Sequence, residues 1–358
     1  MVLTIVSFIV VLGVLVFIHE FGHYITAKKS DIMVSEFALG FGPKLLSKQV
    51  GETLYSIRAI PLGGFCNMVG EFPPDDSMPA EEREIYDKAK AKGRLFNQKS
   101  PLKRLAVILM GPIMNFLLAV LIFISAFAIF GVPTSTNEAA ILGEVIPEQP
   151  AAEAGLRAND KILSINGQEV NNWNEMSELI RENSEQKISI RYQRNNQIKE
   201  ITVTPMYSEE SERGVIGVYP KLIREDVSLF SALTLGLEQS YRVFKMTILG
   251  FVQMFRESSA EDVGGPIMIA SIIGQAARVG ILNVLNWMAI ISINLGIINL
   301  LPFPALDGGR ILFIVVELIR GQPVDPRKES YVHMLGFAIL MLLMVFIIYN
   351  DVMRTFFN

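Results

Sequence analysis

The residues His19-Glu20-Phe21-Gly22-His23 lie inside an apolar run that extends from Val2 to Lys28. A run of this length is sufficient for about one crossing of a bilayer. Residues four apart share one face of a helix, so the two imidazoles project side by side, with the Glu20 carboxylate next to the first. Ionisable groups within a membrane span are costly and are usually functional or paired. The pentapeptide therefore predicts a membrane helix that carries a functional group of side chains.

His19 and His23 match the two-histidine arrangement that binds zinc. Neutral imidazoles bind this metal at about 2.0–2.1 Å, and a catalytic site adds a third protein ligand and keeps a fourth position for water. Glu20 is then suited to deprotonate that water. The chain has three histidines, and two of them fall in this pentapeptide, which makes a chance coincidence a poor explanation. The alternative is a structural polar cluster that packs spans together.

The composition agrees with a membrane protein. Hydrophobic residues make up 51% of the 358 residues and charged residues only 19%, whereas soluble domains carry about a quarter. The formal net charge of -4 offers no basic surface for nucleic acid. The single cysteine, Cys66, cannot close an intramolecular disulfide. Nucleic-acid binding and redox chemistry are therefore not expected.

Three further apolar stretches follow the first one. Leu105 to Asn137 contains no charged residue, Val279 to Leu306 is broken by Pro302 and Pro304, and Tyr331 to Asn350 is the last. We expect a polytopic α-helical membrane protein with about four transmembrane helices, the third of them broken. A secretory signal peptide is the alternative for the first run, but no basic residue precedes it and no small-x-small cleavage site follows it.

Basic residues near the spans predict the orientation in the membrane. They cluster at Lys28, Lys29, Lys103, Arg104, Arg320, Arg327 and Lys328. Because cytoplasmic loops carry an excess of Lys and Arg, we expect these flanks to be cytoplasmic. Both chain termini, and the region from about residue 137 to about residue 278, would then face the outside.

The segment from Ala139 to Met206 differs in character from the apolar runs. It contains two short alternating strands, one helical stretch and turn signals, namely Ile188–Tyr192, Ile198–Val203, Met176–Arg181, Asn166-Gly167 and Asn195-Asn196. These features predict a small α/β domain. The order of elements and the segments 146–156 and 160–167 resemble a PDZ domain, with a generic α/β insert as the alternative. The stretch from Ser228 to Phe255 follows this predicted domain. Its pattern of apolar and charged residues is typical of an amphipathic helix on the membrane surface or of an ordinary packing helix.

The leading candidate for a third metal ligand is Asp307, in the run from Asn299 to Arg310. Pro302 and Pro304 just before it interrupt the helix, and irregular backbone at membrane depth is tolerated only in a buried site or a wet cavity. The alternative is that Asp307 caps the following helix. His333 is a competing ligand, but a lone histidine at the start of a span is more typical of an interfacial position.

Together these residues resemble the site-2 protease family of intramembrane zinc metalloproteases, and among them the bacterial regulator-of-sigma-E-protease type. The match includes the pentapeptide at 19–23, the run 299–309 and one PDZ-like insert. Shorter matches are Gly40-Phe41-Gly42-Pro43, Ile60-Pro61-Leu62-Gly63-Gly64-Phe65, Gly111-Pro112-Ile113-Met114-Asn115 and Gly264-Gly265-Pro266. Members of this type often carry two tandem PDZ domains, whereas the space here holds one.

The resemblance implies that His19, His23 and Asp307 bind one Zn²⁺ per chain and that Glu20 is the general base. It further implies regulated intramembrane proteolysis in a bacterial inner membrane. The substrates would be transmembrane segments of single-pass membrane proteins that another protease has trimmed, for example anti-sigma factors or signal-peptide remnants.

Further site candidates are less specific. Asn299 and Asn115 are candidates for holding the developing oxyanion. The β-prone stretch from Leu54 to Met68 predicts a hairpin that turns at Gly63-Gly64. In the family the matching region is a membrane-associated β-like loop, so Gly63, Gly64 and Phe65 are candidates for pairing with an unwound substrate. A soluble cytoplasmic hairpin is the alternative. The mixed charges of residues 71–99 indicate a solvated loop without assigned chemistry.

The expected organisation has four parts. These are an N-terminal membrane part (1–137), a PDZ domain (138–220), amphipathic linker helices (221–278) and a C-terminal membrane part (279–358).

Two other functions compete with the protease. A non-catalytic PDZ membrane scaffold would need no zinc, and a metal transporter would have no need for the glutamate between the histidines.

Overall fold

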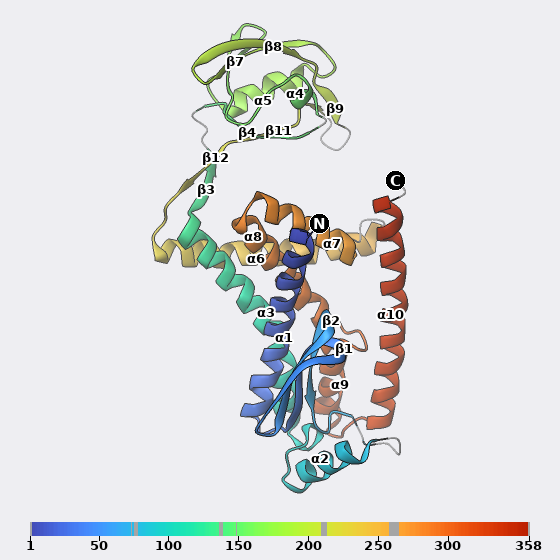
Figure 1. Cartoon of the computed structure of the whole chain (residues 1–358). Helices are drawn as coiled ribbons and strands as arrows, with labels where there is room; N and C mark the ends of the chain where they lie inside the picture. Colours follow the sequence, from blue (N-terminus) through green and yellow to red (C-terminus); the bar gives the residue numbers. More distant parts are fainter. Residues whose placement is uncertain are drawn as a thin grey trace. The chain divides into compact units, whose positions relative to one another are not determined.

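The computed structural model describes residues 2–72, 74, 78–135, 139–147, 149–208, 213–257 and 265–356. Glu148, Gly264 and the expected boundary at residues 137 and 138 lie outside this set. The chain divides into two compact units (Figure 1). The membrane unit comprises residues 1–127 and 229–358, and the inserted unit comprises residues 128–228.

Four described helices are long and apolar enough to cross a membrane. They are α1 (Val2–Lys29), α3 (Pro101–Phe130), α8 (Ile281–Leu300) and α10 (Pro326–Phe356, apolar to Met353). The expectation of four spans is thus confirmed on length and composition. After α8 the chain passes through Pro302 and Pro304, which cannot donate backbone hydrogen bonds, and forms a new helix, α9 (Asp307–Arg320). Arg104 of α3 and Glu317 of α9 form an ion pair at 2.5 Å.

Two helices connect the inserted unit to α8. These are α6 (Leu229–Glu257) and α7 (Pro266–Val279). One side of α6 packs on its neighbours, where Gly236 lies against Ile124 of α3 and Thr247 donates to Asn294 Oδ1 of α8 at 2.8 Å. Apolar side chains remain exposed along the same helix, among them Leu229, Phe230, Leu233, Leu237, Tyr241 and Leu249. The helix therefore combines a packing side with an unpartnered apolar side.

The start of α7 is capped by a carboxylate from a distant part of the chain. The buried Asp351, near the end of α10, accepts hydrogen bonds from the backbone N–H groups of Gly265, Ile267 and Met268 at 3.1, 3.0 and 3.2 Å. The first N–H groups of a helix have no partner within the helix. A negative charge beside them also interacts favourably with the positive end of the helix dipole. Asp351 thus joins the two helices.

A β-hairpin follows α1, formed by β1 (Val34–Val50) and β2 (Thr53–Met68). Both strands bend sharply. Residues 36–39 pair on one side with 54–57, and residues 34–39 pair on the other side with 64–68. Residues 44–50 pair with 53–58. In the described part of the chain, segment 64–68 pairs with β1 alone and is therefore an edge of this sheet.

The expectation of a turn at Gly63-Gly64 is wrong, because the chain reverses at Gly51-Glu52 and Gly63-Gly64 lie inside β2. Gly51 adopts a φ of 61°, which a glycine tolerates without steric cost. Glu52 ties the turn to the end of α1, since Lys28 and Arg94 donate to its carboxylate at 2.6 Å. The hydrogen bonds from Arg94, followed by those from Lys28, lower the pKa of Glu52 to about 2.

The next segment packs beneath the hairpin. It contains α2 (Ala80–Ala91) and the short helix η1 (Phe96–Gln98). A small cluster of Val69, Ala89 and Leu95 holds it in place.

The inserted unit is built on a four-stranded antiparallel sheet of order β6-β5-β7-β8. Its helices and strands are β3 (Val132–Ser135), β4 (Leu142–Val145), α4 (Pro150–Glu153), β5 (Lys161–Ile165), β6 (Gln168–Glu169), α5 (Trp173–Glu182), β7 (Ile188–Arg194), β8 (Gln197–Val203), β9 (Met206–Ser208), β10 (Arg213–Val215), β11 (Val218–Pro220) and β12 (Leu222–Glu225). The expected helix, the two expected strands and the turn at Asn195-Asn196 between β7 and β8 are confirmed. The compact unit extends beyond 138–220 because β3 pairs with β12.

Candidate metal centre

The histidine pair lies near the carboxyl end of α1. His19 and His23 are one helical turn apart, and both are buried, with 7% and 5% of their surfaces exposed. Their burial follows from close packing of α1 on α3. Two glycines allow this approach, because a Cβ at Gly22 would collide with the backbone of Met110, and a Cβ at Gly111 would collide with the His23 ring.

Asp307 reaches the pair from the first turn of α9. The loop before it is held by an unusual backbone conformation at Ala305, with a φ of 76°, and by a hydrogen bond from the Ala305 N–H to His333 Nδ1 at 2.9 Å. A Cβ at Gly308 would collide with the Leu301 carbonyl, so this tight loop requires a glycine there. Leu306 occupies the N-cap position and its side chain makes no capping hydrogen bond, so the interpretation of Asp307 as a cap is wrong.

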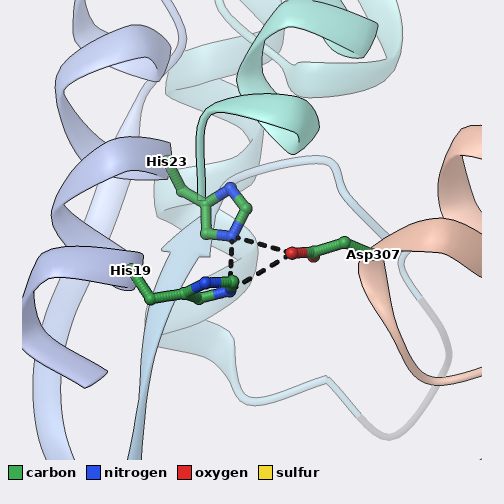
Figure 2. A group of neighbouring side chains, drawn as sticks. All are labelled: His19, His23 and Asp307. Carbon is green, nitrogen blue, oxygen red and sulfur yellow. Dashed lines mark hydrogen bonds and ion pairs between the residues drawn. The ribbon is translucent and has the colours of Figure 1, made fainter. Parts of the chain in front are cut away.

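Three side-chain atoms converge, as Figure 2 shows. Asp307 Oδ2 lies 3.2 Å from His19 Nε2 and 3.4 Å from His23 Nε2. The two Nε2 atoms are 3.3 Å apart. A tetrahedron with metal–ligand distances of about 2.0–2.1 Å has edges of about 3.3–3.4 Å, so the triangle matches one face of a zinc coordination sphere.

The chemistry of the donor atoms also fits a cation. His23 Nδ1 lies 2.9 Å from the carbonyl oxygen of Val107, which can only accept, so Nδ1 carries a proton. In the neutral imidazole that a metal ligand requires, Nε2 is then the nitrogen with the free lone pair. The Nε2 lone pair of His23 then faces Asp307 Oδ2, which is also an acceptor. Two acceptors at this distance repel each other unless a cation lies between them. The triad therefore fits a zinc ion, with one position left for water or substrate.

A pocket of about 380 Å³ opens beside the triad. Glu20 contributes to its wall and lies next to β2, since a Cβ at Gly64 would be 3.4 Å from Glu20 Cγ. The edge segment of the hairpin forms a second wall. The lining residues are His19, Glu20, His23, Gly64, Phe65, Cys66, Asn67, Met68, Glu71, Phe72, Ile108, Asn299, Ala305, Asp307 and Arg310.

The other residues singled out from the sequence fall into two groups. Asn299, Gly64 and Phe65 line the pocket, whereas Gly63 and Asn115 do not. Asn115 is fully buried in α3, and its amide lies 3.1 Å from His19 Nδ1, on the far side of that ring from Nε2. His333 is not part of the triad and instead contacts the loop at Ala305. The position of Asn115 argues against a role at the oxyanion.

Sequence reasoning missed one wall of the pocket. Glu71 forms an ion pair with Arg310, three residues after Asp307, and the Arg310 guanidinium lies 5.3 Å from the centre of the Phe72 ring. Glu71 falls at the start of the charged segment to which no chemistry was assigned. The informative signal was Arg310 itself, because a charge so close to a buried carboxylate requires a partner.

Comparison with known proteins agrees with this geometry. The sequence profile described as Peptidase family M50 matches residues 7–343. The chain belongs to peptidase family M50. The match includes the histidine pair and Asp307 as well as most of α10. It confirms the resemblance to the site-2 protease family that the sequence motifs indicate.

Curated relatives of this M50 peptidase match over nearly their whole length. Zinc metalloprotease RasP of Geobacillus kaustophilus is 35% identical, with 99% of this chain and 98% of the relative covered. Regulator of sigma-W protease RasP of Bacillus subtilis is 33% identical, with 99% of each chain covered. The alignment with each relative thus spans nearly the whole of this chain, and so both of its compact units.

Proposed function

We propose that this M50 peptidase is a zinc-dependent endopeptidase that cleaves transmembrane segments of single-pass membrane proteins. The convergence of His19 Nε2, His23 Nε2 and Asp307 Oδ2 within 3.2–3.4 Å carries the proposal. A non-catalytic scaffold has no need of three buried ligand atoms beside a pocket. The names of the RasP relatives, which include zinc metalloprotease, agree with this function.

In this proposal His19, His23 and Asp307 hold one zinc ion. When bound, zinc polarises the scissile carbonyl and lowers the pKa of water at the site. The Val107 carbonyl keeps the His23 ring in the orientation and tautomer that a metal ligand requires. Burial of the triad excludes bulk water and so strengthens the electrostatic interactions in the pocket.

Glu20 is the general base in this mechanism. It lines the same pocket as the triad and is not one of the three converging residues. Its carboxylate removes a proton from the attacking water and passes it to the leaving amine. Asn299, at the end of α8, also lines the pocket and can donate its amide N–H to the developing oxyanion.

The free edge of segment 64–68 is suited to hold an unwound substrate. Its residues line the pocket and pair with β1 on the other side. A peptide that adds as a further strand satisfies its own backbone groups, which an unwound helix at membrane depth must do. Gly64 and Phe65 would then contact the substrate near the scissile bond, and Gly63 would lead the chain into this segment.

A direct assay tests the proposed activity. Detergent-purified protein is incubated with a single-pass model substrate, with and without a zinc chelator. We expect cleavage within the apolar segment that the chelator abolishes and that added zinc restores. Cleavage that persists in full after the metal has been removed and its absence verified would contradict the proposal.

The spans support an orientation with both termini outside a bacterial inner membrane. In a Cys66→Ser background, cysteines at Lys29 and Arg327 are expected to resist a membrane-impermeant thiol reagent in intact cells, because both flank the basic ends of spans. A cysteine at Asn166 in the inserted unit should react. Permeabilised cells provide the control, in which all three should react. Reaction of the Arg327 cysteine in intact cells would overturn the four-span orientation.

The inserted unit, which we propose to be a PDZ domain, is suited to restrict access. An unrestricted intramembrane protease would attack many single-pass proteins, so we propose that the domain excludes substrates whose outer portions have not been trimmed by another protease. Ser135 and Leu222 are partners in adjacent antiparallel strands, so a two-residue Asn-Gly turn can join them in place of residues 136–221. We expect this deletion to allow cleavage of untrimmed substrates and to leave cleavage of trimmed ones unchanged.

Assays of both substrate forms separate exclusion from delivery. If the domain instead captures new carboxyl termini and delivers them, the deletion should slow cleavage of trimmed substrates. Zinc binding by the deletion variant reports separately whether its membrane unit still folds. Unchanged cleavage of both forms would contradict exclusion and delivery alike.

A further inference from the structure

Two polar groups of α3 contact the histidines of the triad. One is the Val107 carbonyl described above, and the other is the side chain of Asn115. It belongs to the motif Gly111-Pro112-Ile113-Met114-Asn115, to which the mechanism above assigns no role. Asn115 is completely buried and does not line the pocket, so it cannot touch a substrate. Its Nδ2 lies 3.1 Å from His19 Nδ1, and its Oδ1 accepts no hydrogen bond from the described residues.

The tautomer of His19 determines whether it can bind a metal through Nε2. A neutral imidazole has one protonated nitrogen and one lone pair, so a ring that binds through Nε2 carries its proton on Nδ1. Ligating histidines almost always donate that proton to an acceptor, which fixes the ring and raises its basicity. His23 has such an acceptor in the Val107 carbonyl. For His19, the described residue at Nδ1 is Asn115.

An asparagine amide can serve either tautomer. In one orientation Nδ2 donates to an unprotonated Nδ1, which leaves the proton on Nε2. Rotation of the amide by half a turn exchanges its nitrogen and oxygen, so that Oδ1 accepts from a protonated Nδ1. Only the second arrangement frees the Nε2 lone pair that faces Asp307.

The backbone around Asn115 is held in place. Ser292 of α8, which is fully buried, donates to the Asn115 carbonyl oxygen at 2.8 Å. Gly111, one turn earlier in α3, lies directly against the rings of His23 and His19. The motif thus combines a glycine that admits the histidines with an amide that contacts one of them.

We propose that Asn115 is a positioning residue that fixes the metal-binding tautomer of His19, with its Oδ1 accepting the hydrogen bond from Nδ1–H. This inference rests on the proposed function, because it requires His19 to be a zinc ligand. Asn115 acts on metal affinity through His19 and makes no contact with zinc, water or substrate. The role is distinct from the oxyanion role considered from the sequence.

Zinc affinity of the detergent-purified full-length protein tests this inference, measured by competition with a chromophoric chelator. Asn115→Ala removes the acceptor and is expected to weaken zinc binding by about 10–100-fold, the usual effect of removing a partner that orients a ligand. Asn115→Asp keeps an acceptor of the same size and cannot donate when ionised. We therefore expect it to retain or exceed the wild-type affinity.

Two further variants make the measurement interpretable. Asn294→Ala removes a half-buried amide of α8 that accepts a hydrogen bond from Thr247 of α6, and we expect unchanged zinc affinity. His19→Ala should lose tight zinc binding. If His19→Ala binds zinc as the wild type does, the ligand set fails and the inference fails with it. If His19→Ala loses zinc but Asn115→Ala does not, the role of Asn115 alone is refuted.

The comparison between alanine and aspartate at position 115 separates positioning from packing. A purely structural amide, or one that acts by donating, would make Asn115→Asp at least as weak as Asn115→Ala. That result would overturn the inference. Recovery of affinity in Asn115→Asp, with loss in Asn115→Ala, would support it even if both variants unfold at a lower temperature than the wild type.

Discussion

Replacement of Glu20 by glutamine is expected to abolish proteolysis while zinc stays bound at one ion per chain. Glutamine has nearly the size of glutamate but cannot accept a proton, and general acid–base catalysis contributes about 10²–10⁴-fold to a rate. Glu20 lines the pocket but is not one of the three converging residues, so the metal should not be disturbed. Loss of rate and retention of metal would separate the base from the ligands.

The measurement pairs metal analysis of the purified protein with cleavage of a single-pass substrate. Glu238→Gln provides a matched control, because this exposed glutamate of α6 forms an ion pair with Arg242 one turn away. The control should keep both zinc and activity. Wild-type cleavage by Glu20→Gln would refute the proposed role of this residue.

Replacement of Asp307 by alanine is expected to remove both tightly held zinc and activity. Asp307 supplies the only carboxylate of the described triad, and its loss leaves two imidazoles on one helix. We expect zinc affinity to fall by more than about 100-fold, beyond the effect of removing a group that merely orients a ligand. Titration of purified protein with zinc against a competing chelator measures this change.

His333→Gln is the matched control for Asp307→Ala. A glutamine oxygen can still accept the hydrogen bond from the Ala305 N–H, so the loop before α9 should keep its shape. The variant should therefore retain zinc. If His333→Gln loses the metal and Asp307→Ala keeps it, the ligand assignment is wrong.

The triad could be predicted from the sequence because local geometry determines most of it. Helical periodicity alone brings His19 and His23 to one face. The prolines at 302 and 304 marked the end of a span. A carboxylate just beyond such a break is also typical of a helix cap, so the histidine pair was needed to favour Asp307 as a ligand. The four spans were predictable for a similar reason, since length and apolarity suffice to recognise them.

The hairpin was harder to predict because strand pairing is not local. Gly51-Glu52 and Gly63-Gly64 are both plausible turns in the sequence, and only pairing with residues 34–50 distinguishes them. The strand 34–50 itself contains Gly40 and Gly42, which obscure its β character. At these positions, with φ values of 88° and 82°, the strand bends back on its partner.

Asn115 and Glu71 were misjudged or missed for another physical reason. An asparagine can donate or accept in any direction, so its partner depends on which helix lies next to it. The approach of α1 to α3 at Gly22 and Gly111 placed His19 beside Asn115. No pattern within either helix specifies this contact.

Asp351 is synthesised well after the helix that it caps. The three N–H groups at the start of α7 receive their acceptor from a residue 83–86 positions later in the chain. During synthesis these groups have no carboxylate partner until the ribosome has released nearly the whole of α10. The start of α7 can therefore reach its final packing only after α10 has been made and has docked beside it.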